Sequence, residues 1–129
     1  VHMESPIYLK GKARKGPTFR EAVLIHAVAR LVLHPQIQNI QTSWVKMGLE
    51  GLKHCLNAGV NDLGGTLMNE SITRAAGTVH GQEMLPEWME NIIQEAGRFP
   101  EQRDTLYRTS GTSQKQKSYG HQQLVKFHA

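Results

Sequence analysis

The residues of this chain that could do chemistry gather at the ends of its predicted strands and in the loops that follow them. In barrels of parallel strands and helices, these positions form the active site. The polar, acidic and aromatic side chains selected by that rule are Glu4, Gln41, Ser43, Trp44, Asp62, Thr66 and Glu70. We expect a substrate-contacting site to be built from these residues.

Asp62 ends a short predicted strand and is followed by a glycine pair. Its carboxylate could bind hydroxyl groups or an amine of a substrate, or it could cap the turn through its own backbone. Gly64 and Gly65 would let a ligand approach the backbone closely, and they also suit a tight turn before a helix.

Charged residues follow this glycine pair. Glu70 and Arg74 have the i, i+4 spacing that pairs charges across one helical turn. Such a pair is usually structural or solvated, and we retain it because it comes directly after the glycine turn. His80, which lies between two glycines, could act as a donor or proton carrier, or it could be an exposed loop histidine.

The elements that must position these residues alternate between strands and helices. Thr18 and Glu21 form a capping box, Pro35 ends the helix that follows, and Gly59 and Gly97 close two later helices. The predicted strands cover residues 2–9, 37–45 and 60–63, and the predicted helices cover 18–33, 46–58, 69–76 and 86–96.

Each long helix has an apolar face that we expect to be buried. For the helix at 18–33 this face is Phe19, Ala22, Val23, Val28, Leu31 and Val32. For the helix at 46–58 it is Leu49, Leu52, Cys55 and Leu56. For the last helix it is Trp88, Met89, Ile92, Ile93 and Ala96.

Short strands alternating with helices indicate an α/β fold built from parallel βα units. The predicted strands would leave two open sheet edges, which argues for a portion of a larger barrel or open sheet. We therefore expect residues 1–107 to be unstable and prone to aggregation when isolated. Residues 108–129 are rich in Ser, Gln, Gly, Lys and His, and we expect a disordered tail there.

The net charge of +4 and the calculated pI of 9.4 come from the tail, because basic residues beyond 107 have no acidic counterparts. A basic face for nucleic acid is therefore not predicted. No apolar run approaches the roughly 20 residues that span a bilayer. The single cysteine, Cys55, excludes an internal disulfide and fits a reducing, cytoplasmic setting. The histidines have no zinc-type spacing, so we expect no mononuclear metal site.

Two stretches carry a resemblance to a known family. They are Asn39-Ile-Gln-Thr-Ser-Trp-Val-Lys-Met-Gly48 and Ala58-Gly-Val-Asn-Asp-Leu-Gly-Gly-Thr-Leu-Met-Asn-Glu-Ser-Ile-Thr-Arg-Ala-Ala-Gly77. The start of the chain, Ala96-Gly97-Arg98 and Gln102-Arg-Asp-Thr-Leu-Tyr107 extend the similarity across residues 1–107. Together they resemble the C-terminal half of the FO synthase family, in particular its second component, the tyrosine-dependent 4-hydroxybenzyl transferase.

The resemblance implies a fold, cofactors and substrates. These enzymes are TIM-barrel-like radical S-adenosylmethionine proteins with a four-iron, four-sulfur cluster. The radical acts on tyrosine, and the resulting fragment is joined to a ribitylamino-uracil before a ring-closing component completes the deazaflavin. Residues 1–107 would then be the last βα units and the C-terminal helix of such a barrel, with the missing N-terminal half as partner and neither nucleic acid nor membrane involved.

One departure from the family bears on activity. The cluster needs three thiolates from a Cys-x-x-x-Cys-x-x-Cys loop. Cys55 is the single cysteine and lies on a predicted helix. We therefore expect the cluster motif in the missing half, and we expect this chain to be inactive by itself.

Within this resemblance, Gln41 and Ser43 would share one strand face and point into the barrel. An amide that both donates and accepts suits the imide-like edge of a uracil, but a polar layer filling the barrel is an equal alternative. Trp44 could stack on an aromatic substrate, although packing at the barrel end is favoured.

Two other readings of the whole chain stay open. One is the menaquinone branch of the superfamily, the futalosine-type radical enzymes, which share a Gln-x-x-Trp strand and a Gly-Gly turn. The other is a non-catalytic remnant or interaction module whose tail recruits a partner. The residue identities at Thr42–Lys46 and Asn61–Leu63 favour FO synthase over the menaquinone branch.

Overall fold

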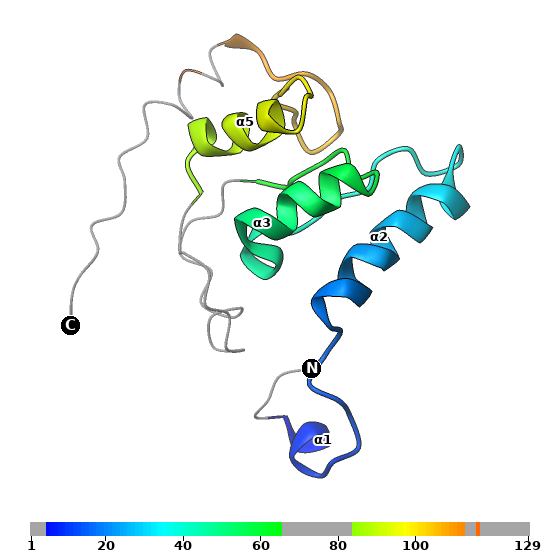
Figure 1. Cartoon of the computed structure of the whole chain (residues 1–129). Helices are drawn as coiled ribbons and strands as arrows, with labels where there is room; N and C mark the ends of the chain where they lie inside the picture. Colours follow the sequence, from blue (N-terminus) through cyan, green and yellow to red (C-terminus); the bar gives the residue numbers. More distant parts are fainter. Residues whose placement is uncertain (1–4, 66–83, 113–115, 117–129) are drawn as a thin grey trace, which may run out of the picture.

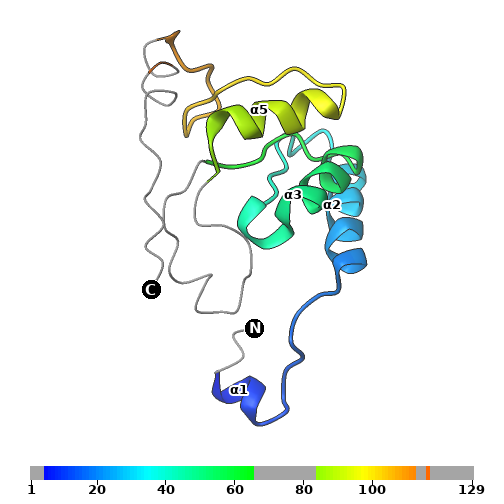
Figure 2. The ribbon, with the colours of Figure 1, turned by 60° about the vertical axis from the view of Figure 1, so that its left-hand side comes forward.

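The computed structural model describes residues 5–65, 84–112 and 116. Its helices are α1 (Pro6–Leu9), α2 (Phe19–Leu33), α3 (Trp44–Asn57) and α5 (Pro86–Glu95). Helix α3 contacts α2 and also α5. Figures 1 and 2 show α1 set apart from these three longer helices. The helix predicted at 69–76 lies outside the described residues.

Helix α2 begins at the capping box that the sequence predicts. The Thr18 hydroxyl accepts from the Glu21 amide at 3.2 Å, and the Glu21 carboxylate accepts from the Thr18 amide at 2.7 Å. The helix ends at Leu33, immediately before His34 and Pro35. These contacts confirm the predicted helix and both of its ends.

Helix α3 begins earlier than predicted. Trp44 and Val45, expected at the end of a strand, form its first turn. The helix is interrupted at Gly48, whose φ of 67° and ψ of 177° are not helical. It ends before Gly59, whose φ of 104° closes the helix in the left-handed region as predicted. Helix α5 likewise starts at Pro86 and is followed by Gly97 with a φ of 72°.

The predicted strands are reduced to one parallel bridge between Gln41 and Asp62. The Thr42 amide donates to the Asp62 carbonyl at 2.9 Å, and the Asn61 amide donates to the Ile40 carbonyl at 3.2 Å. This parallel pairing does not extend into the βα units expected from the sequence, and the other bridge in residues 5–65 and 84–112, between Arg103 and Thr109, is antiparallel.

The strand predicted at 2–9 is also wrong over its described residues, where Pro6–Leu9 is helical. Ser5 caps this short helix through a hydrogen bond from the Tyr8 amide, and Pro6 occupies its first turn. Both residues favour the start of a helix, and that local preference prevails over the apolar pattern that suggested a strand.

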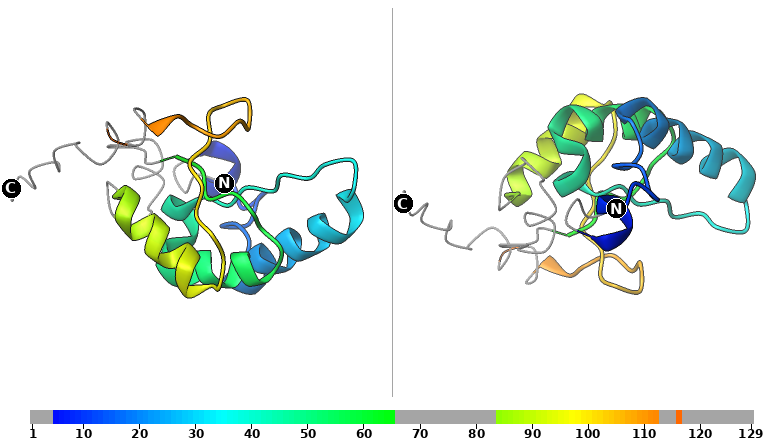
Figure 3. Two further views of the ribbon diagram at one scale, coloured as in Figure 1. Left: turned by 90° about the horizontal axis from the view of Figure 1, so that it is seen from above. Right: turned by 90° about the horizontal axis from the view of Figure 1, so that it is seen from below.

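The core forms where α3 meets the bridged segments and α5. Its buried apolar residues are Ile40, Trp44, Val45, Leu52, Cys55, Leu56, Val60, Leu63, Met84 and Ile92. In the two views of Figure 3, α2, α3 and α5 lie in a row along one side, and the extended segments lie on the other. No helix in the described ranges is long and apolar enough to cross a membrane.

Several side chains expected in the core are exposed. On α2, Val23 and Ala29 pack against the core, whereas Phe19, Val28, Leu31 and Val32 do not. Leu49 of α3 and Trp88 of α5 are about half exposed as well. The reason is geometric: α3 covers one side of α2, and Val28, Leu31 and Val32 lie on the other side.

Candidate cleft beside the Asp62 turn

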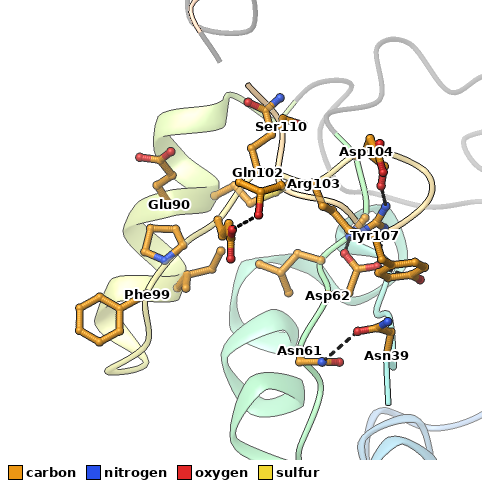
Figure 4. Close-up of a pocket in the computed structure, with 18 of the residues that line it drawn as sticks. Asn39, Asn61, Asp62, Glu90, Phe99, Gln102, Arg103, Asp104, Tyr107 and Ser110 are labelled. Carbon is orange, nitrogen blue, oxygen red and sulfur yellow. Dashed lines mark hydrogen bonds and ion pairs between the residues drawn. The ribbon is translucent and has the colours of Figure 1, made fainter. Parts of the chain in front are cut away.

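A cleft of about 1250 Å³ lies beside the turn that follows the Gln41–Asp62 bridge. One wall is the turn itself, Asp62 to Gly65. The second is α5, through Pro86, Met89 and Ile93, and the third is the segment from Arg98 to Gly111. Figure 4 shows Asp62, Arg103 and Tyr107 gathered at one end of this cleft, with Phe99 at its other end.

Asp62 is the centre of a polar cluster. Its Oδ2 accepts from Arg103 Nη2 at 2.5 Å and from the Tyr107 hydroxyl at 3.5 Å. Its Oδ1 accepts from the Gly64 amide at 3.2 Å. The Asp62 side chain is only 9% exposed, so this carboxylate is a nearly buried charge that is held by a cation and by hydrogen bonds.

Arg103 completes the cluster from a position far away in the sequence. Its hydrogen bond with Asp62 raises the pKa of the guanidinium, and its Cζ lies 4.3 Å from the centre of the Tyr107 ring. Nη1 donates to the Asp104 carbonyl at 2.9 Å. The remaining nitrogen, Nε, is buried and has no partner within the described part of the chain.

Asp104 shapes the loop that presents Tyr107. Its Oδ1 accepts from the amides of Leu106 and Arg108 at 2.8 and 3.0 Å. The hydrogen bonds from Arg108 and from the Leu106 amide lower the pKa of this carboxyl. Tyr107 adopts a φ of 61°, which is unusual for a residue with a side chain. The folded loop thereby places the Tyr107 ring against Arg103.

Residues that the sequence predicted for the site contact the glycine turn on the side away from the cleft. Gly64 has a φ of 77°, and a Cβ there would lie 2.9 Å from Nε2 of Gln41. Trp44 is buried in the core, and its Nε1 donates to the Gly65 carbonyl at 3.0 Å. Gln41, Trp44 and Asp62 therefore fix the path of the turn together.

The Arg98 side chain ties the segment after α5 to the rest of the fold. Its Nη1 donates to the Val60 carbonyl at 2.9 Å, and its Nη2 donates to the Leu56 carbonyl at 2.7 Å. The second bond reaches the last turn of α3, where backbone carbonyls lack helical partners. Arg98 thus holds the start of the third wall of the cleft, and Arg103 holds its middle.

Comparison with known proteins places this arrangement in a family. Residues 7–116 match the family described as "CofH/MqnC C-terminal region". The chain belongs to this family. Since the match covers the bridge, the glycine turn and the segment that carries Arg103, the whole described cleft lies within the CofH/MqnC C-terminal region.

Individual relatives agree with the family match. A 5-amino-6-(D-ribitylamino)uracil--L-tyrosine 4-hydroxyphenyl transferase from Methanopyrus kandleri is 53% identical over 107 residues, 83% of this chain and 29% of the relative. FO synthases from Mycobacterium leprae and Streptomyces avermitilis are 49% and 50% identical over 86% and 83% of this chain.

The chain spans 13% and 12% of those two FO synthases, so it corresponds to a small part of each. No solved structure matches the chain. The resemblance to FO synthase that the sequence motifs suggested is confirmed by these identities.

The structure brings together only part of the predicted site. Asp62, Gly64 and Gly65 line the cleft, and Gln41 and Trp44 support the turn. Ser43 precedes α3 without a capping hydrogen bond from its side chain. The other predicted site residues, Glu4, Thr66, Glu70, Arg74 and His80, lie outside the described residues.

The sequence did not predict two arginines and a tyrosine of this CofH/MqnC C-terminal cleft. Arg98, Arg103 and Tyr107 stand in stretches that carried the family resemblance, but no chemical role was predicted for them. The available signal was the acidic Asp62 after a strand, which needs a cation once it is buried. Nothing local indicates that this cation is Arg103, because the pairing spans 41 positions.

The residues of this chain do not fit an iron–sulfur cluster. A four-iron cluster of this superfamily needs three thiolates, and Cys55 is the single cysteine. Cys55 is fully buried in the core, with its Sγ 3.9 Å from Nδ1 of His26. No group of three or more metal-ligand side chains occurs within the described ranges.

Proposed function

We propose that this chain is the C-terminal part of a transferase of FO biosynthesis. The longer enzyme would transfer a 4-hydroxybenzyl group from L-tyrosine to 5-amino-6-(D-ribitylamino)uracil. The observation that carries the proposal is the 53% identity to the Methanopyrus kandleri relative, whose name specifies both substrates. The family match spans the Asp62 turn and the Arg103 segment, so the cleft lies within the matched region.

The radical chemistry would be supplied by the part of the enzyme that precedes this chain. That part would hold the four-iron, four-sulfur cluster and S-adenosylmethionine, since this chain lacks the thiolates for a cluster. Residues 1–107 would complete a TIM-barrel-like fold, and residues 108–129 would form a basic tail. The enzyme would act in the cytoplasm, and a ring-closing component would use its product.

Asp62 would contact the ribityl hydroxyls or the amine of the uracil substrate. A carboxylate offers about four acceptor positions, and the described contacts of Asp62 use three. One lone pair therefore remains for a substrate donor at the wall of the cleft. Arg103 and Tyr107 would hold the carboxylate in place while it accepts this bond.

The other predicted substrate contacts would complete the site around this turn. Gly64 and Gly65 would allow the substrate to approach the backbone, and Gln41 and Trp44 would fix the turn from behind. The remaining candidates for contact with either substrate are Glu4, Ser43, Thr66, Glu70, Arg74 and His80.

A chimera of the Methanopyrus kandleri relative tests this function. Residues 1–116 of this chain, which include the whole cleft, would replace the corresponding segment, and iron and sulfide would be reconstituted anaerobically. We expect mass spectrometry to detect the adduct of tyrosine and the ribitylamino-uracil, and we expect the adduct to disappear when the segment is deleted. A chimera that cleaves S-adenosylmethionine but makes no adduct would refute the proposal and favour the menaquinone branch or a non-catalytic remnant.

An Asp62→Asn variant of the same chimera tests the role of the cleft. A lost hydrogen bond to a charged group costs about 1.5–3 kcal/mol, so KM for the uracil substrate should rise about 10- to 100-fold. The KM for tyrosine should stay unchanged. Glu101→Gln, which lies on the same cleft wall, is the control variant. Equal effects of the two substitutions would remove Asp62 from the substrate site.

A further inference from the structure

Helix α2 carries a second apolar stripe on the side away from α3. It consists of Leu24, Ile25, Val28, Leu31 and Val32, which recur at intervals of three and four residues. Each of these side chains is about half exposed or more, and Leu31 is 81% exposed. A helix of a globular protein that is apolar on opposite sides is normally covered on both.

The covered side of the same helix shows what such a contact looks like here. Val23 and Ala29 pack against the core beside α3. Arg30 reaches across to α3's end and donates to the Gly59 carbonyl at 2.7 Å. The outward stripe has comparable apolar content but no such contact in the described residues, so it is an unpartnered surface of the right shape for another packed element.

The comparisons indicate what covers this stripe. This chain spans 29% of the Methanopyrus kandleri relative, so most of that relative's polypeptide lies outside the matched segment. Since the family is described as a C-terminal region, that remainder would precede the segment. Helix α2 is the first long helix after the start of the family match at residue 7. In Figure 1 it lies at the end of the row of long helices, with α3 on one side.

We propose that the outward stripe of α2 is the seam on which the preceding part of the polypeptide packs in the longer enzyme. This inference rests on one element of the proposed function, namely that the chain acts as the C-terminal part of a longer protein. The occupant is an apolar face of that preceding part. Its packing buries Leu31 and Val32, completes the second side of α2 and holds the cleft next to the radical-generating part.

Hydroxyl-radical footprinting tests the seam without using activity. The 129-residue chain is compared with the longer chimera that joins it to the preceding part of the Methanopyrus kandleri relative. Tryptic peptides 21–30 and 31–46 report the stripe, and peptide 104–108 contains Leu106, an exposed leucine away from α2. We expect oxidation of Ile25, Leu31 and Val32 to fall several-fold in the chimera, while oxidation of Leu106 stays unchanged.

A pair of substitutions provides the second measurement. Leu31→Glu should leave the helicity and the thermal midpoint of the 129-residue chain unchanged, because the side chain is already exposed there. It should lower the midpoint of the chimera, whereas Leu106→Glu should not. If Leu31→Glu unfolds the isolated chain, the double variant Leu31→Gln, Val32→Gln takes its place.

Each alternative outcome overturns the inference. Equal oxidation of the stripe in both proteins would show that the preceding part does not cover it. Protection that grows with the concentration of the 129-residue chain and is absent from the chimera would assign the stripe to a second copy. A chimera that protects the stripe yet makes no adduct would refute the proposed function and leave the seam intact.

Discussion

Arg30 of α2 and Gly59 after α3 are in direct contact. The Nε of Arg30 donates to the Gly59 carbonyl at 2.7 Å, and its other nitrogens donate to the Gln38 carbonyl and to Oδ1 of Asn61 at 2.8 and 3.0 Å. A Cβ on Gly59 would lie 2.7 Å from Cγ of Arg30. One arginine therefore joins α2, the end of α3 and both segments of the parallel bridge.

Gly59→Ala should destabilise the chain by about 3 kcal/mol, because left-handed backbone strain of about 1–2 kcal/mol is added to the displacement of Arg30. Gly97→Ala is the matched control. Gly97 also follows a helix and has a φ of 72°, but a Cβ there meets nothing within 4 Å. It should cost about 1–2 kcal/mol. Urea unfolding at low protein concentration, followed by the fluorescence of Trp44 and Trp88, measures both losses. Equal losses would contradict the role of Arg30.

The helix ends could be predicted because their signals are local. Thr18 with Glu21, Pro86 and Gly59 each act within a few residues of where they stand, and the structure confirms all of them. The strand predictions were wrong because strand pairing is not local. Strand formation needs a partner that is distant in sequence, and in the described residues Gln41 finds one in Asp62 alone. At Ser5 and Pro6 a local helix signal was present and was given too little weight.

The site was predictable on its acidic side but not on its basic side. Asp62 and the glycine pair follow the rule that strand ends carry function, and they line the cleft. Arg103 and Tyr107 reach that carboxylate through a loop that depends on Asp104, and no periodicity in the sequence encodes such a contact. The predicted burial of the apolar side chains of α2 was wrong for a similar reason, since an apolar stripe does not indicate which neighbour covers it.

Arg103→Gln should cost about 3 kcal/mol of unfolding free energy. The substitution leaves the nearly buried Asp62 carboxylate without its cation, and breaking a buried pair costs about 3–5 kcal/mol. The lower end applies because the Arg103 side chain is 28% exposed. Urea unfolding measures the change.

The exposed pair Arg108–Asp104 provides the control for this prediction. Arg108→Gln should cost at most about 1 kcal/mol, as expected for a surface ion pair. The double variant Asp62→Asn, Arg103→Gln should lose less than the sum of its single variants. Additive losses would mean that the two side chains do not stabilise each other.

Glu21 should titrate below the ordinary value of 4.5, because the hydrogen bond from Arg14 and the Thr18 amide lower the pKa of its carboxyl. A lowered folded-state pKa stabilises the fold above the unfolded-state value, and this stabilisation is lost as the pH falls through the folded-state value. Carbon-13 NMR of the Glu21 carboxyl measures the pKa. Arg14→Gln should move it back towards 4.5, and an unchanged value in that variant would exclude Arg14 as the cause.

The burial of Cys55 makes the rate of its chemical modification a measure of how often this protein opens. A thiol that is fully enclosed between α2 and α3 reacts with an alkylating reagent only when the helices separate, so its modification rate reports the frequency of that event. Gly59→Ala, which disturbs the same junction, should accelerate the modification strongly, and Leu106→Glu should not. Because the sequence contains no other cysteine, one mass increment counts each opened molecule, and no cysteine has to be introduced or removed.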